Sequence, residues 1–143
     1  MADELPEELA GLTPDEVLAF LRTASDDEVR ERVHGIGTRT LLGLLFDAWA
    51  ARVPAAARSD GLLGFELDDD GSLHRHALQL SADGAVHVAE PGERVRATVR
   101  TTVVRFLRVA AGAQDPTRLV LTGRMRLGGD ALWAVTTLAG LKR

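Results

Sequence analysis

The chain has 143 residues, of which 45% are hydrophobic and 27% charged, and this composition suits one compact domain. It contains no cysteine, which excludes disulfides, thiol nucleophiles and thiolate zinc sites, and aromatic residues make up only 4%, which argues against base stacking on nucleic acid. The formal net charge is −4, but residues 1–60 and 61–93 each carry −6 and residues 94–143 carry +8. We expect either that the acidic and basic segments neutralise each other in the folded chain or that the basic segment offers a surface to anionic partners.

Two short helices are predicted near the start of the chain. Thr13-Pro14-Asp15-Glu16 and Ser25-Asp26-Asp27-Glu28 each have the form of a capping box, in which two side chains satisfy backbone amides at a helix start. They predict helices over residues 14–23 and 26–34, the second closed by glycine.

A longer helix is predicted over residues 38–53, where Pro54 stops it. Its apolar residues recur at helical spacing and predict a buried stripe: Leu42, Phe46, Trp49 and Val53.

From residue 61 the apolar period changes to two, which is typical of strands. Three strands are predicted, around residues 63–67, 74–80 and 86–88, with tight turns at Asp70-Gly71 and Asp83-Gly84. The sequence therefore predicts a β-meander in the middle of the chain.

The last third predicts two more strands and two more helices. A fourth strand over residues 94–100 alternates small apolar residues with arginine, and a helix over residues 102–111 follows it, with Arg105 and Arg108 on its outer side. A fifth strand is predicted over residues 118–127. A final helix over residues 131–141, capped by Asp130, is apolar on nearly all sides.

Three motifs in this order resemble sterol carrier protein type 2 domains. They are Leu78-Gln79-Leu80-Ser81-Ala82-Asp83-Gly84, the loop Gly112-Ala113-Gln114-Asp115-Pro116, and the run Gly123-Arg124 to Gly129-Asp130 before the last helix. The resemblance covers roughly residues 38–141. It implies an α+β fold in which helices pack on one face of a five-stranded, mostly antiparallel sheet and enclose an apolar cavity. It also implies that residues 1–37 are an N-terminal helical extension of a bacterial type and that residues 38–143 form the lipid-binding domain.

The histidines do not predict a metal site. A hairpin centred on Asp83-Gly84 places His87 opposite Leu80, so His76 is expected roughly 13 Å along the strand, too far for one zinc ion. His74 and His76 share a face, and a two-histidine site is the alternative to their being rim or surface residues. Asp68-Asp69-Asp70-Gly71 is interpreted as a solvated turn. No cofactor, metal or catalytic constellation is predicted, so the chain is not expected to be an enzyme.

The candidate ligand-binding residues follow from the helices and strands above and from the fold that the resemblance implies. Those expected to line the cavity wall are Phe46, Trp49, Phe106, Trp133, Val135 and Leu138, and those expected to form its floor on the fifth strand are Leu119, Leu121 and Met125. His76 is the candidate for a polar head group. The last helix is predicted to be a gate that turns on Gly128-Gly129, with Leu132 facing inward and Trp133 partly exposed without ligand.

These observations predict a module that binds and carries a fatty acid, acyl thioester, sterol or isoprenoid. The acidic N-terminus and the lack of a long apolar run lead us to expect a cytoplasmic protein, with transient contact to anionic membranes and none to nucleic acid. One alternative is an interaction module or homodimer with a vestigial cavity. The other is an accessory protein or enzyme that presents a hydrophobic substrate in lipid or polyketide metabolism.

Overall fold

The computed structural model describes residues 14–53, 60–89, 91 and 94–141. Its helices are α2 (Pro14–Thr23), α3 (Asp26–Ile36), α4 (Thr38–Arg52), α5 (Val103–Ala110), α6 (Pro116–Leu121) and α7 (Ala131–Leu141). Its strands are β1 (Gly61–Asp69), β2 (Ser72–Ser81), β3 (Gly84–Ala89), β4 (Ala97–Thr102) and β5 (Arg126–Gly129).

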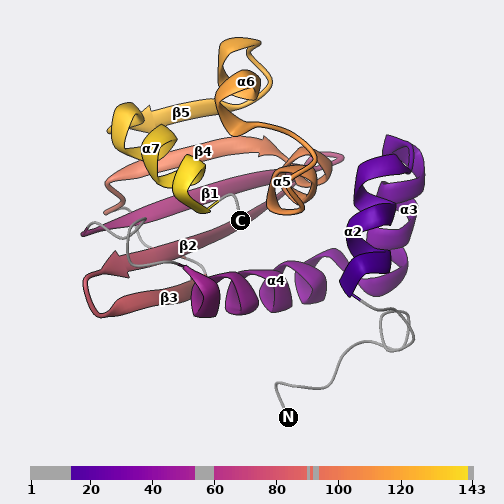
Figure 1. Cartoon of the computed structure of the whole chain (residues 1–143), viewed down its shortest axis with the longest axis horizontal. Coiled ribbons are helices and arrows are strands. Elements are labelled where there is room, and N and C mark those ends of the chain that lie inside the picture. Colours follow the sequence, from indigo (N-terminus) through magenta and orange to yellow (C-terminus); the bar gives the residue numbers. More distant parts are fainter. Residues whose placement is uncertain (1–13, 54–59, 90, 92–93, 142–143) are drawn as a thin grey trace.

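The five strands form one sheet in the order β3-β2-β1-β4-β5. β1 pairs with β4 in parallel, and the other three neighbouring pairs are antiparallel. Helices α4, α5 and α7 lie over the same face of this sheet, while α2 and α3 stand at one end of it (Figure 1). The predicted α+β fold with a mostly antiparallel sheet is confirmed.

The helix starts follow from the capping residues in the sequence. Ser25 and Glu28 form the complete capping box of α3, and Thr102 caps α5 by accepting a hydrogen bond from the amide of Arg105. Asp130 accepts a hydrogen bond from the amide of Trp133, so its predicted role as the cap of α7 is confirmed. Gly37, at a φ of 102°, turns the chain between α3 and α4.

Alternate residues of each central strand face the helices and form the core. The buried side chains of β1, β2 and β4 on this side include Leu63, Phe65, Leu67, Leu78, Leu80, Ala97 and Val99. The helices contribute Leu42 and Phe46 from α4, Phe106 and Leu107 from α5, and Trp133 and Leu138 from α7. The stripe predicted on α4 is confirmed, because Leu42, Phe46 and Val53 are buried and Trp49 is half-buried.

The predicted strand over residues 118–127 is wrong. Residues 116–121 form helix α6, and only residues 126–129 form a strand. Asp115 caps α6 through the amide of Thr117, and Pro116 occupies its first turn. Proline at that position suits a helix start, because its fixed φ is helical and its missing N–H has no partner to lose. The residues after Pro116 therefore form a helix, although their alternating apolar pattern favours a strand.

The outward position predicted for Arg108 is also wrong. Its side chain is buried, and its guanidinium donates hydrogen bonds to the carbonyls of Leu21 and Ala24 and to the carboxylate of Asp26. These partners lie at the end of α2 and the start of α3, so a single arginine of α5 binds the corner between the two N-terminal helices.

Candidate ligand-binding core and histidine pair

Four aromatic rings fill the space between the sheet and helices α4 and α5. The ring of Phe46 lies 5.1 Å from those of Phe65 and Phe106 and 6.1 Å from that of Trp49, measured between centroids. Trp49 and Phe106 also meet edge to face at 5.5 Å. Three of the four rings are fully buried, so a ligand in this region has to displace aromatic side chains.

Most of the predicted lining residues are buried or half-buried. The buried ones are Phe46, Phe106, Leu119, Met125, Trp133 and Leu138, and the half-buried ones are Trp49 and Val135. Leu119 lies on α6 and Met125 on the turn after it, so the floor predicted on a fifth strand is not formed by them. Leu121 lies at the end of α6 with 82% of its surface exposed, which rules out its predicted place in the sheet.

The orientation predicted for α7 is wrong as well. Trp133 is only 8% exposed, whereas Leu132, expected to face inward, is 78% exposed. The indole packs against Gly61, where a Cβ would come within 2.9 Å of the ring, and the guanidinium of Arg96 lies 4.4 Å from the ring centroid. Gly128 and Gly129 belong to β5 and pair with β4, so they are not a free hinge.

His76 and His87 are neighbours, contrary to the sequence-based register. Leu78, and not Leu80, lies opposite His87, because Ala82 and Asp83 form the turn between Ser81 and Gly84. His87 is therefore diagonal to His76 on the same face of the sheet. The Nδ1 atom of His76 lies 2.8 Å from Nε2 of His87, and Nδ1 of His87 lies 2.8 Å from a carboxylate oxygen of Asp47 on α4.

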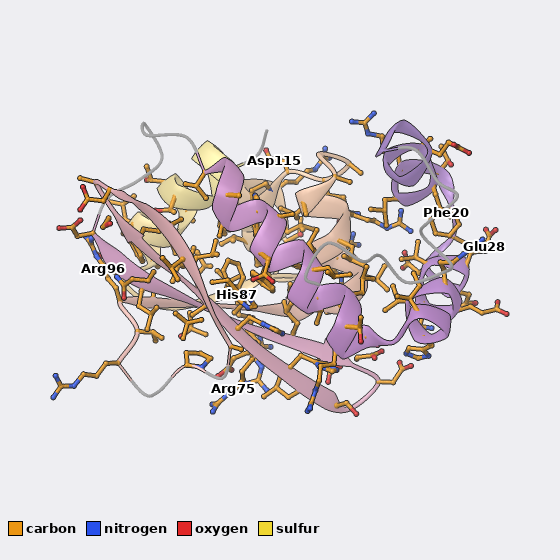
Figure 2. All side chains as sticks on the ribbon, turned by 90° about the horizontal axis from the view of Figure 1, so that it is seen from below. Phe20, Glu28, Arg75, His87, Arg96 and Asp115 are labelled. Atoms are coloured by element: carbon orange, nitrogen blue, oxygen red, sulfur yellow. The ribbon has the colours of Figure 1, made fainter. Side chains whose placement is uncertain are left out.

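This chain of three side chains runs from the surface into the core. Asp47 is exposed, the side chain of His87 is mostly buried, and His76 is 7% exposed. Both imidazoles stack on the ring of Phe46, at 4.7 Å for His76 and 5.3 Å for His87. Figure 2 shows His87 beside α4, on the sheet side of that helix. Of the two predicted positions for His76, rim or surface, the surface position is wrong because the residue is buried.

The surroundings of His76 disfavour its charged form. Burial, and then the electrostatic influence of the neighbouring imidazoles of His87 and His74, lower the pKa of His76 to about 4, while the carboxylate of Asp47 acts in the opposite direction. His76 is therefore a neutral imidazole at neutral pH, with one ring nitrogen bonded to His87.

A pocket of about 520 Å³ borders His76 beyond the end of β3, where β2 continues and forms the edge of the sheet. It is lined by Arg39 of α4, by residues 73–76 of β2, and by Ala89 and Pro91. Arg75 points to the outer side and donates a hydrogen bond to Glu66 at 3.1 Å. The remaining basic side chains in the lining are those of Arg39, His74 and His76.

A separate polar cluster joins α3, α4 and β1. Asp69 accepts a hydrogen bond from the hydroxyl of Thr38 and pairs with His34. One potential metal-ligand atom each of His34, Asp69 and Asp70, a ring nitrogen or a carboxylate oxygen, lies within 4.8 Å of the other two. Burial alone raises the pKa of Asp69, but the hydrogen bonds of His34 and Thr38 outweigh it and hold that pKa below the usual value. The predicted turn at Asp70-Gly71 is present, but Asp69 is not a solvated residue.

The comparison with family models identifies one family. A family model described as the SCP-2 sterol transfer family matches residues 44–137. Similar solved structures include sterol carrier protein 2 from Yarrowia lipolytica without ligand, with 18% identity and a TM-score of 0.59 over 73% of this chain and 90% of that one. Another is palmitated SCP2L2 from Aedes aegypti, with 13% identity and a TM-score of 0.55 over 68% of this chain and 88% of that one.

A third similar structure is a stereoselective inverting sec-alkylsulfatase from a Pseudomonas species, with 19% identity and a TM-score of 0.56. The match covers 74% of this chain but only 16% of the sulfatase, so the likeness concerns one part of that enzyme. No curated protein matches the chain in sequence. Within the described residues, none of the helices has the length and apolar character needed to cross a membrane.

Proposed function

Because the chain belongs to the SCP-2 sterol transfer family, we propose that it binds a lipid-like molecule between its sheet and helices and carries it. The observation that supports this most is the position of the aromatic cluster. Phe46, Trp49, Phe65 and Phe106 form an apolar interior whose members come from α4, β1 and α5. Side chains on helices can move apart from the sheet without breaking its hydrogen bonds, and ligand area buried there contributes about 25 cal/mol per Å².

Tryptophan fluorescence tests the proposal directly. Trp49 lies in the aromatic cluster, so a Trp133→Phe variant leaves it as the single reporter. Titration with dodecanoic acid, its methyl ester, a sterol and an isoprenoid alcohol is expected to change the emission of Trp49 with a Kd of about 1 µM or below for at least one of them. Native mass spectrometry of protein purified without detergent reports any ligand retained from the host. No response to any of the four compounds, together with no retained ligand, contradicts the carrier function.

The proposal is for a carrier without a reaction of its own. In the part of the chain that the structure describes, the hydrogen bonds of His76 and His87 lead to each other and to Asp47. They do not lead to a serine or threonine hydroxyl that an imidazole could activate as a nucleophile. Unchanged acyl thioester after long incubation with the protein is the expected result, and turnover that depends on His76 contradicts it.

Transient contact with anionic membranes is proposed for loading and unloading. Several arginines of the basic C-terminal region are exposed, among them Arg100, Arg118, Arg124 and Arg126. Their attraction to anionic lipid is screened by salt. We expect co-sedimentation with phosphatidylserine vesicles that falls as salt rises. Equal binding to neutral phosphatidylcholine vesicles contradicts the proposed contact.

A second candidate function is protein interaction. Leu121 on α6 and Leu132 on α7 are both exposed large apolar residues. Size-exclusion chromatography with native mass spectrometry distinguishes the two functions, because an interaction module or homodimer shows a complex that Leu132→Ser weakens. A monomer that binds lipid supports the carrier instead.

A further inference from the structure

The hydrogen-bonded chain of Asp47, His87 and His76 links the proton positions of the two rings. A carboxylate only accepts, so Nδ1 of His87 donates to Asp47 across their 2.8 Å contact. In the arrangement in which Nε2 of His87 accepts, Nδ1 of His76 donates to it across the second 2.8 Å contact. Nε2 of His76 is left with a lone pair, so the chain ends in a proton acceptor.

This last nitrogen is not sealed inside the protein. Among the described residues, the one buried side-chain nitrogen or oxygen without a hydrogen-bond partner is Oε1 of Gln114. Nδ1 of His76 is bonded to His87, and the same ring lines the pocket of about 520 Å³ beside β2. The ring of His76 therefore lies at the boundary between the aromatic core and this pocket.

The pocket has a positive lining. The charged and titratable groups that act on His76 are Arg39 and Asp47 from α4, His74 from β2 and His87 from β3. Asp47 is hydrogen-bonded to His87 and does not line the pocket, whereas Arg39 and His74 do. The charged and titratable side chains among the described lining residues are Arg39, His74, Arg75 and His76, so an anionic group beside them meets basic side chains.

We propose that this pocket binds the carboxylate head group of a long-chain acid, with His76 as its hydrogen-bonding partner and Arg39, which lines the same pocket, as a permanent positive charge. The proposal rests on the proposed lipid-carrier function and names the head group that the carrier prefers. The tail of the acid extends from the pocket toward Phe46, on which His76 stacks at 4.7 Å.

Binding of the acid is coupled to uptake of one proton. Without ligand, burial keeps His76 neutral, with its pKa at about 4. A carboxylate against Nε2 favours the imidazolium, and Asp47 stabilises the same charge from the other end through His87. One proton from solvent binds to Nε2, which donates it in a hydrogen bond to the carboxylate, and no other bond is made or broken. An ester or alcohol carries no such charge and binds without a proton.

Calorimetry with two ligands of equal chain length tests this coupling. Dodecanoic acid and methyl dodecanoate are titrated into the protein near about pH 7 in phosphate and in Tris, whose ionisation enthalpies differ, so the number of protons taken up is measured. We expect close to one proton per bound acid, none per bound ester, and about tenfold tighter binding of the acid. Between about pH 8 and pH 6 the Kd of the acid should fall about tenfold per pH unit.

Four variants locate the effect. His76→Phe keeps a ring against Phe46 and should bind the ester within about threefold of wild type while losing both the proton uptake and the preference for the acid. Asp47→Asn changes an exposed residue, so it keeps the proposal testable if His76→Phe does not fold, and it should lower both quantities. Arg39→Gln should weaken binding of the acid alone. Arg32→Gln removes an exposed arginine of α3 as the matched control and should change neither the affinity for the acid nor the proton uptake.

The outcomes separate this proposal from the carrier function. Equal affinity of wild type for acid and ester without proton uptake overturns the head-group site and leaves the carrier intact. Preference for the acid that persists in both His76→Phe and Arg39→Gln also overturns the site. Failure of both compounds to bind at all is a failure of the carrier function itself.

Discussion

The guanidinium of Arg108 donates a 2.6 Å hydrogen bond to the backbone carbonyl of Leu21, 87 residues earlier in the chain. Leu21 lies in the last turn of α2, where carbonyls have no partner within the helix. A second nitrogen of the same guanidinium bonds the carbonyl of Ala24 and the carboxylate of Asp26, both at 2.8 Å. Arg108 thereby joins the N-terminal helices to the α5 helix of the family domain.

Replacing Arg108 with methionine should cost about 3 kcal/mol of unfolding free energy, because two buried carbonyls lose their donor. Urea melts followed by circular dichroism measure the change. Arg105→Met is the matched control on the same helix. The guanidinium of Arg105 donates a long hydrogen bond of 3.5 Å to the carbonyl of Arg124, so its loss should cost less than about 1 kcal/mol. Equal losses in the two variants would show that Arg108 is not the anchor.

The neighbouring residues Trp133 and Leu132 should respond oppositely to truncation. Trp133→Ala removes a buried indole that contacts Gly61 and Arg96 and should cost about 3–5 kcal/mol. Leu132→Ala removes an exposed side chain and should stay within about 0.5 kcal/mol of wild type. Thermal and urea melts of ligand-free protein make the comparison. A small loss for Trp133→Ala would restore a gating role for α7.

The two glycines of β5 should also differ in how much an alanine substitution destabilises the protein. A Cβ on Gly129 would lie 2.6 Å from the carbonyl oxygen of Arg96, and its φ of 71° is unfavourable for other residues. Gly129→Ala should therefore destabilise the protein by about 2 kcal/mol or more. At Gly128 the nearest atom is 4.0 Å away, so Gly128→Ala should be close to neutral. Chemical melts of both variants decide, and equal tolerance would argue against the close pairing of β5 with β4.

The neutral His76 should make stability depend on pH. Its pKa is about 4 in the folded protein and near its model value of 6.5 when unfolded, so the unfolded state binds more protons between these two values. Stability should fall as the pH is lowered from about 6.5 to about 4, by roughly 3 kcal/mol in total. His76→Phe should flatten this part of the profile. Urea midpoints measured across the range test it, and an unchanged slope in the variant would show that another group is responsible.

The sequence by itself determined most helix boundaries and the faces of the central strands. The capping box at Ser25 and the caps at Thr102 and Asp130 act within a few residues of the chain, so they can be recognised without knowing the fold. Alternation in β1 and β2 likewise identifies their buried sides. Helix α6 carries such a local signal too, in Asp115-Pro116, but the alternating residues after it favoured a strand. That error was avoidable from the sequence.

Only the tertiary structure decided which histidines meet. Moving β3 by two residues along β2 leaves every side chain on the same face, so the alternating pattern fits both registers equally well. The turn at Ala82 and Asp83 and the packing of β3 under α4 select the register in which His87 lies between His76 and Asp47. Asp47 is 40 residues from His87 in the sequence, and no local spacing relates the two. The candidate head-group site therefore depends on contacts that form only when the helix closes over the sheet.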